Sequence, residues 1–114
     1  MNFKEPRGKP EKRASEALVD LMQSHGWVIK RLNVSAGNYS TPGWPDYFAA
    51  HHKHGPRWIE MKIKGGSLEE SQIKFCTDFA AVKVGVWILT GPNDYKLLFE
   101  EPNWWQYCMR GKIR

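Results

Sequence analysis

The sequence predicts an α/β fold in which a small mixed β-sheet is flanked by helices. Three observations lead to this prediction: an amphipathic helical pattern opens the chain, three short strand-like segments follow it, and a second helical pattern precedes a continuous apolar run. The whole order is then a helix, three strands, a helix, two strands and a short closing helix, from which a small mixed sheet flanked by helices follows. The 114 residues suffice for one compact domain and exclude a second. We therefore expect a single domain over residues 11–114.

Residues 1–10 predict a flexible basic arm, because Pro and Gly are mixed there with Lys and Arg. From Glu11, apolar residues recur at helical spacing, which predicts an amphipathic helix that ends before Gly26. Residues 27–32 are rich in strand formers and predict a strand. The Gly-, Asn- and Ser-containing stretch at 33–45 predicts a loop.

Residues 47–50 and 57–63 predict two strands of an antiparallel hairpin, with the turn over residues 51–56. If the turn centres on Lys53 and His54, residues pair when their numbers sum to about 106. The start of the first strand then lies opposite the end of the second.

The second half of the chain predicts a helix, two strands and a short closing helix. Ser67 and Glu70 have the spacing of a capping box at the start of the helix. The continuous apolar run at 85–89 predicts a central strand, and residues 95–99 predict another short one. Residues 102–109 predict a short aromatic helix.

Two carboxylates and one ammonium gather at one end of the predicted hairpin. Alternation along the strand sends Glu60 and Lys62 to the same face, an arrangement that by itself is more often only a solvated surface. The register adds Asp46 opposite Glu60, and opposed carboxylates persist best with a cation between them. A hard divalent cation such as Mg²⁺ fits these oxygens, and Lys62 beside it can position water, as phosphodiester hydrolysis requires.

These residues resemble the PD-(D/E)XK nucleases, and within them the virus-type replication-repair (VRR-NUC) nucleases. Gly43-Trp44-Pro45-Asp46 is similar to their G-x-P-D motif, and Glu60-Met61-Lys62 to their E-x-K motif. Gln72 resembles the glutamine that follows in this subgroup, and Glu11 is similar in placement to the helical acidic residue. Asn103-Trp104-Trp105 resembles phage-borne members. The resemblance implies a restriction-endonuclease-like αβββαβ core.

Glu16 competes with Glu11 for the place of the helical acid. On a helical wheel Glu11 falls beside Leu18 and Met22 on the apolar face, whereas Glu16 lies nearly opposite Ala14 and is expected to meet solvent. We therefore favour Glu11, on the hypothesis that this face points toward the site.

The resemblance implies an Mg²⁺-dependent DNA endonuclease, with Mn²⁺ as a substitute. Asp46, Glu60, Glu11 and the Met61 carbonyl would hold the metal, and Lys62 and Gln72 would complete the catalytic site. Related stand-alone nucleases act as homodimers on branched DNA, which implies a homodimer and a Holliday junction or another branched substrate.

Two alternatives stay open. A sequence-specific nickase or homing-type endonuclease needs base contacts, for which the loop at 33–45 is the only candidate. A non-catalytic DNA-binding module needs only positive charge, although it leaves Asp46 and Glu60 unexplained.

Charge and cysteine content bound the partners and the compartment. The net charge of +5 favours a polyanionic partner, and the basic residues near both ends serve either solubility or contact with phosphates. Cys76 and Cys108 lack the spacing of a zinc site and are expected to be small buried hydrophobes in a reducing compartment. Without an apolar leader or a long apolar run, we expect no membrane partner and a cytoplasmic location.

The remaining notable residues have structural interpretations. His51, His52 and His54 are expected to be surface residues of the hairpin turn instead of metal ligands. Trp104 and Trp105 are expected to dock the last helix onto the core instead of stacking on bases.

Overall fold

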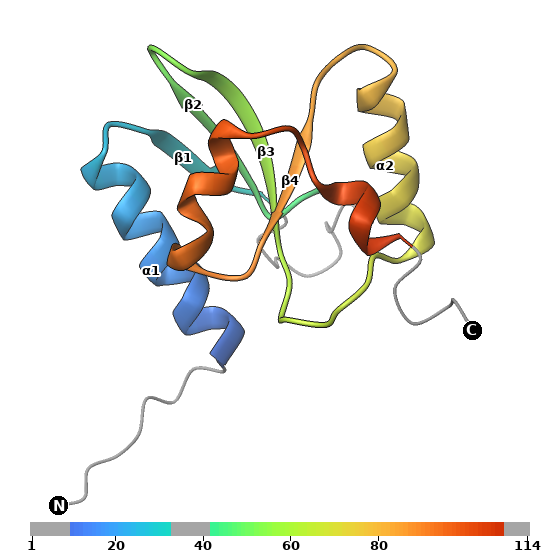
Figure 1. The fold of residues 1–114 in the computed structure, drawn as a ribbon, viewed down its shortest axis with the longest axis horizontal. Coiled ribbons are helices and arrows are strands. Elements are labelled where there is room, and N and C mark those ends of the chain that lie inside the picture. Colours follow the sequence, from blue (N-terminus) through green and yellow to red (C-terminus); the bar gives the residue numbers. More distant parts are fainter. Residues whose placement is uncertain (1–9, 33–41, 109–114) are drawn as a thin grey trace, which may run out of the picture.

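The structure, a computed structural model, describes residues 10–32 and 42–108 of the chain. The predicted αβββαβ order is confirmed, with two 3₁₀ helices after the last strand (Figure 1). The elements are α1 (Pro10–Ser24), β1 (Val28–Arg31), β2 (Tyr47–His51), β3 (Gly55–Met61), α2 (Glu70–Ala80), β4 (Val86–Leu89), η1 (Pro92–Phe99) and η2 (Trp104–Tyr107).

The four strands form one mixed sheet in the order β1-β2-β3-β4. β2 is antiparallel to β1 and β3, whereas β4 is parallel to β3 and is reached through α2. Tyr47 pairs with Ile59 and Phe48 with Trp58, which is the register that the position of the turn predicted.

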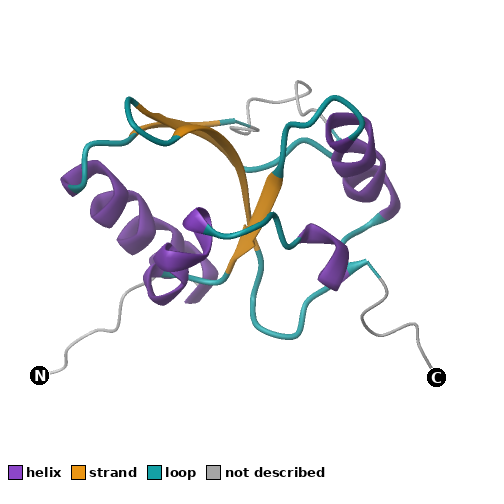
Figure 2. Cartoon of the chain, turned by 45° about the horizontal axis from the view of Figure 1, so that its top comes forward, coloured by secondary structure: helices purple, strands orange, loops and turns teal. Residues whose placement is uncertain are grey.

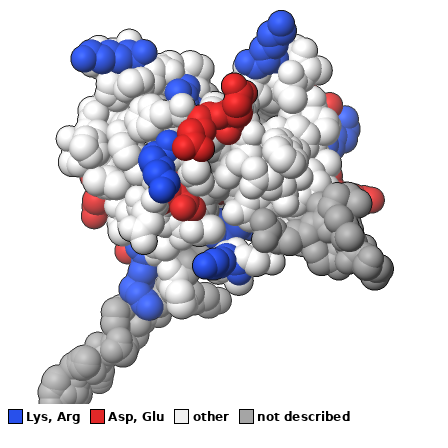
Figure 3. All heavy atoms as spheres, in the orientation of Figure 1, with Lys and Arg blue, Asp and Glu red and all other residues white. Residues whose placement is uncertain are grey.

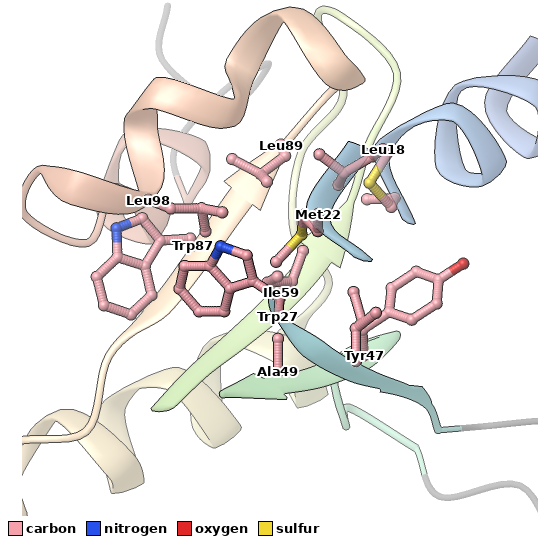
Figure 4. Packing of buried hydrophobic residues seen from close by; sticks show 11 residues of the cluster. Leu18, Met22, Trp27, Tyr47, Ala49, Ile59, Trp87, Leu89 and Leu98 are labelled. Carbon is pink, nitrogen blue, oxygen red and sulfur yellow. The ribbon is translucent and has the colours of Figure 1, made fainter. Parts of the chain in front are cut away.

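Helices cover both faces of the sheet (Figure 2). α1 and η1 pack on one face, where Leu18, Met22 and Leu98 meet the inward side chains of the strands (Figure 4). α2 and η2 pack on the other face, against Val86 and Ile88 of β4. Side chains therefore alternate along β3 between two separate cores, with Ile59 and Met61 in the first core and Trp58 packed against the second.

α1 follows the predicted apolar pattern and ends as predicted. Leu18 and Met22 are fully buried on its inner face. Gly26 adopts a φ of +93°, and the Trp27 N–H donates to the Met22 carbonyl while the Gly26 N–H donates to the Gln23 carbonyl. This is the Schellman ending that a glycine after a helix favours, since only glycine adopts that backbone without steric cost.

The predicted strand at 95–99 is wrong, because these residues belong to the 3₁₀ helix η1. The outer edge of β4 is already occupied by the Asn103 side chain. Its Oδ1 accepts the Ile88 N–H at 2.7 Å, and its Nδ2 donates to the Ile88 carbonyl at 2.9 Å. A side-chain amide thus satisfies the backbone edge that a fifth strand would have paired.

Three predicted boundaries are also corrected. β3 ends at Met61 instead of residue 63, because the Met61 N–H donates to a side chain, Asp46. α2 begins after Glu69 and not at the predicted Ser67–Glu70 box, since the Leu68 N–H donates to the Tyr107 carbonyl and holds that residue outside the helix. The closing helix predicted for 102–109 is only the short η2.

Most other structural interpretations are confirmed. Cys76 is buried, and this burial raises the pKa of its thiol to about 12. Cys108 is half-buried against the second core. His52 and His54 are exposed at the hairpin turn, with His51 half-buried beside them. Trp104 packs against the second core as predicted, but the prediction is wrong for Trp105, which is 62% exposed.

Several predictions fall on residues outside the described part of the chain. The first is the arm predicted at residues 1–10, of which only Pro10 is described, as the first residue of α1. The second is the loop predicted at 33–45, of which only residues 42–45 are described. Among the described residues, no helix is both long enough and apolar enough to cross a membrane.

Candidate active site

Asp46 is positioned by a tight turn that docks onto the start of α2. Gly43 adopts a φ of +87°, and a Cβ added to it would overlap the backbone carbonyl of Ser71. The turn therefore requires glycine both for its conformation and for its close approach to α2. Pro45 is buried and leads into Asp46, whose Oδ2 accepts the Met61 N–H at 2.8 Å. One carboxylate oxygen is thus fixed against the end of β3.

Glu60 lies next to Asp46 across the two strands. Because Tyr47 pairs with Ile59, Asp46 enters the sheet alongside Glu60. The Glu60 side chain is almost completely buried, with 6% of the residue exposed. A buried carboxylate needs polar partners, and its Oε2 accepts a hydrogen bond from Gln72 Nε2 at 2.9 Å.

Lys62 and Gln72 approach Glu60 from different elements. The Lys62 Nζ lies 3.7 Å from Glu60 Oε2, just beyond the end of β3. Gln72 belongs to the first turn of α2, where its Oε1 also accepts the Glu69 N–H at 2.9 Å. Gln72 therefore connects the carboxylate of Glu60 to the backbone at the start of α2.

The electrostatics around Asp46 have opposing contributions. Burial raises the pKa of the Asp46 carboxyl above its ordinary value, while the Met61 N–H and the charges of Lys62 and Arg31 act to lower it. Arg31, at the end of β1, is a neighbour that the sequence patterns did not identify. Its pairing with Tyr47 places it near the site, and no sequence signal could have found it, because residues 27–32 were predicted as a strand without an assigned partner.

The donor set fits a hard divalent cation. Asp46 and Glu60 supply carboxylate oxygens at the same end of the hairpin. The N–H and C=O of a residue in an extended strand point to the same side, so the Met61 carbonyl faces the side on which Asp46 lies. These are oxygen ligands of the type that Mg²⁺ prefers. Among the described side chains, no group of three His, Cys, Asp or Glu converges, so a third protein oxygen must come from the backbone or from elsewhere.

Glu11 lies in the first turn of α1, and its side chain is outside the described part of the structure. Ala14, three residues further along, lies beside Gly91, which follows the end of β4. The start of α1 is therefore at the same end of the sheet as Glu60, which pairs with Ile88 of β4. α1 covers the opposite face of the sheet from Gln72, so Glu11 would have to reach the site around that end. Glu16 is exposed, as expected.

Comparison with known proteins identifies the fold. No protein-family model and no curated protein matches the chain. Among solved structures, a VRR-NUC domain matches it with a TM-score of 0.66 and 16% sequence identity, over 82% of this chain and 98% of that one. The chain therefore has the restriction-endonuclease-like fold of a VRR-NUC domain, as the motifs implied.

Proposed function

We propose that this protein is a metal-dependent nuclease that hydrolyses phosphodiester bonds in DNA. The observation that carries the proposal is the convergence of Asp46, Glu60 and Lys62 at one end of the hairpin, in a chain with the fold of a VRR-NUC domain. A basic surface alone would not require a buried carboxylate beside a second carboxylate. The acidic pair therefore favours an enzyme over a DNA-binding module.

In this proposal Asp46, Glu60 and the Met61 carbonyl hold Mg²⁺, for which Mn²⁺ substitutes. The cation would neutralise charge that develops on the phosphate oxygens. The Met61 N–H fixes the orientation of Asp46, and Gln72 fixes that of Glu60. Glu11 is the proposed fourth ligand, from the start of α1.

Lys62 has the role of a cation beside the reacting phosphate. Its ammonium lies 3.7 Å from Glu60 Oε2 and is largely shielded from solvent. At this position it can orient the attacking water or stabilise negative charge in the transition state. Neither role requires Lys62 to lose its proton.

A cleavage assay tests the proposal. The protein is incubated with single-stranded, duplex and four-way-junction DNA in Mg²⁺, Mn²⁺ or EDTA. We expect cleavage only with a metal, its abolition by Asp46→Ala, and a loss of about 100-fold or more with Lys62→Ala. The controls are Asp78→Ala and Lys74→Ala, which break an exposed ion pair on α2 and should leave cleavage unchanged. Absence of metal-dependent cleavage of every substrate by the wild type would overturn the proposal.

Binding measured in EDTA separates catalysis from affinity. Asp46→Ala should bind DNA as well as the wild type or more tightly, because it removes a negative charge that repels phosphate. A folded Asp46→Ala variant that binds much more weakly would contradict this placement of the DNA. Two further variants test which acidic residue of α1 belongs to the site. Glu11→Ala should abolish cleavage, and Glu16→Ala should not.

The family resemblance also supports a homodimer that acts on branched DNA. A domain this small is too short to surround a duplex, and a second copy would supply the second cut of a junction. Sedimentation over a range of concentrations should show a dimer, and the junction should be cleaved faster than the linear duplex. Equal rates on both substrates would contradict the preference for branched DNA.

A further inference from the structure

Trp44 is a partly exposed aromatic side chain at the edge of the acidic site. It is 42% exposed, whereas the core residues Trp27 and Trp87 are 4% and 7% exposed. Its ring meets the Trp58 ring edge-on, with centroids 6.0 Å apart, and its centroid lies 5.6 Å from that of Phe75. One part of the indole is therefore fixed by an aromatic cluster while another part faces solvent.

The aromatic cluster lies directly beside the carboxylates. Trp44 precedes Asp46 by two residues, and Trp58 precedes Glu60 by two residues on the same face of β3. Two residues of chain span at most about 7 Å, so Trp44 lies close to Asp46. A phosphate at the acidic site would thus have the base of an adjacent nucleotide within reach of Trp44.

The backbone around Trp44 is held rigidly. Gly43 packs against the Ser71 carbonyl, and the following Pro45 is buried. An aromatic ring that is already fixed in place loses little conformational entropy when a ligand stacks on it. Trp44 is therefore prepared for stacking before any ligand arrives.

Positive charge lies on the same face of the sheet as Trp44. Lys30 is exposed on β1 opposite Phe48, whose ring lies 4.8 Å from that of Trp58. Lys62 lies beside Glu60, which shares this face of β3 with Trp58. Cations and an exposed aromatic ring on one face are the combination that binds the phosphates and bases of a single nucleic acid strand.

We propose that Trp44 stacks on an unpaired nucleobase next to the phosphate that the acidic site receives. This inference rests on the proposed nuclease function. A base inside a duplex has both faces covered by its neighbours, so the stacking partner is a nucleotide in a single strand, at a frayed end or at a branch. Trp44 would then select substrates whose bases are unstacked beside the cleaved bond.

The test compares a short oligothymidylate with a sugar-phosphate strand of the same length that lacks bases. Dissociation constants for both are measured in EDTA, where no cleavage occurs. The wild type should bind the oligothymidylate about 5- to 150-fold more tightly, the range for stacking of one base. Trp44→Leu should reduce this ratio to about 1, and Trp44→Phe, which retains a stacking ring, should give an intermediate ratio.

Trp105→Leu is the matched control. Trp105 is more exposed than Trp44 but lies on η2, and its replacement should leave the ratio unchanged. The proposal is overturned by a wild-type ratio near 1, by an equal loss for both strands in Trp44→Leu, or by a fall of the ratio in Trp105→Leu. Trp44→Phe keeps the test valid if loss of packing against Phe75 unfolds Trp44→Leu.

The failure of this inference differs from the failure of the proposed function. If the wild type cleaves no DNA but its binding ratio depends on Trp44, the nuclease proposal fails and the stacking stands. If the protein cleaves DNA but the ratio is independent of Trp44, only the stacking fails.

Discussion

Gln72 has two hydrogen-bonding roles, one as a donor and one as an acceptor, which its side-chain amide fulfils together. Its Nε2 donates to Glu60, and its Oε1 accepts the Glu69 N–H at the start of α2. A carboxylate would lack the donor, and an ammonium would lack the acceptor. Gln72 therefore orients a carboxylate of the candidate site and also caps the start of α2.

We predict that Gln72→Leu lowers the free energy of unfolding by about 1–2 kcal/mol, because it removes a helix-capping acceptor and a donor to a buried carboxylate. Urea denaturation measures this loss. Gln23→Leu, on the exposed side of α1, is the control and should change stability by less than about 0.5 kcal/mol. Equal effects of the two substitutions would show that the bonds of Gln72 contribute nothing to stability.

Gly43 and Gly55 both have positive φ values, of +87° and +80°, but differ in their surroundings. A Cβ on Gly43 would overlap the Ser71 backbone, whereas one on Gly55 would meet open space. We predict that Gly55→Ala costs about 1–2 kcal/mol of stability, from backbone strain alone, and that Gly43→Ala costs at least about 1 kcal/mol more. Urea denaturation of both variants checks the difference, and equal costs would contradict the close packing of the turn on α2.

At the scale of the elements, β4 is protected by a side chain instead of by another strand. Residues 95–99 are rich in aromatic and aliphatic side chains and resemble a short strand, but the sequence does not reveal that Asn103 occupies the edge of β4. Ile88 and Asn103 are fifteen positions apart in the sequence, so no local sequence pattern predicts their contact. Elements with strong periodicity, such as α1, were predictable because burial of one face determines them.

We predict that Asn103→Ala lowers the free energy of unfolding by about 1–3 kcal/mol, because it leaves the Ile88 N–H and carbonyl without their amide partner. Asn103→Asp should not rescue this loss, since a carboxylate has no donor for the Ile88 carbonyl. Asn93→Ala, an exposed substitution on η1, should change stability by less than about 0.5 kcal/mol. Full stability of Asn103→Asp would show that only the bond to the Ile88 N–H matters.

The candidate site was predictable to the extent that strand pairing determines it. The position of one turn placed Asp46 alongside Glu60, and the structure has that register. The contact of Gln72 with Glu60 required the approach of α2 to the sheet, and the influence of Arg31 on Asp46 required the pairing of β1. These contacts join separate elements, so they follow from packing and not from spacing within a motif.

At the scale of the whole molecule, the excess positive charge lies at the two ends of the chain. Residues 10–108 contain eleven basic and eleven acidic residues. The net charge of +5 therefore comes from residues 1–9, with three basic residues and one acidic, and from residues 109–114, with three basic residues. On the face shown in Figure 3, basic and acidic side chains are interspersed and neither sign covers the surface.

This distribution predicts that the terminal segments supply most of the nonspecific attraction for DNA. Neutralising Arg110, Lys112 and Arg114 with Gln should weaken binding and should lower the slope of log affinity against log salt by up to about 3. The control replaces Lys74, Lys83 and Lys96, which are exposed and change the net charge equally. It should lower the slope by less than about 1 if the location of the charge matters and not only its sum. Titrations over a range of salt concentrations measure both slopes. A slope that the terminal substitutions leave unchanged would leave the terminal basic residues with a role in solubility alone, and equal decreases in the two variants would show that only the sum of the charge matters.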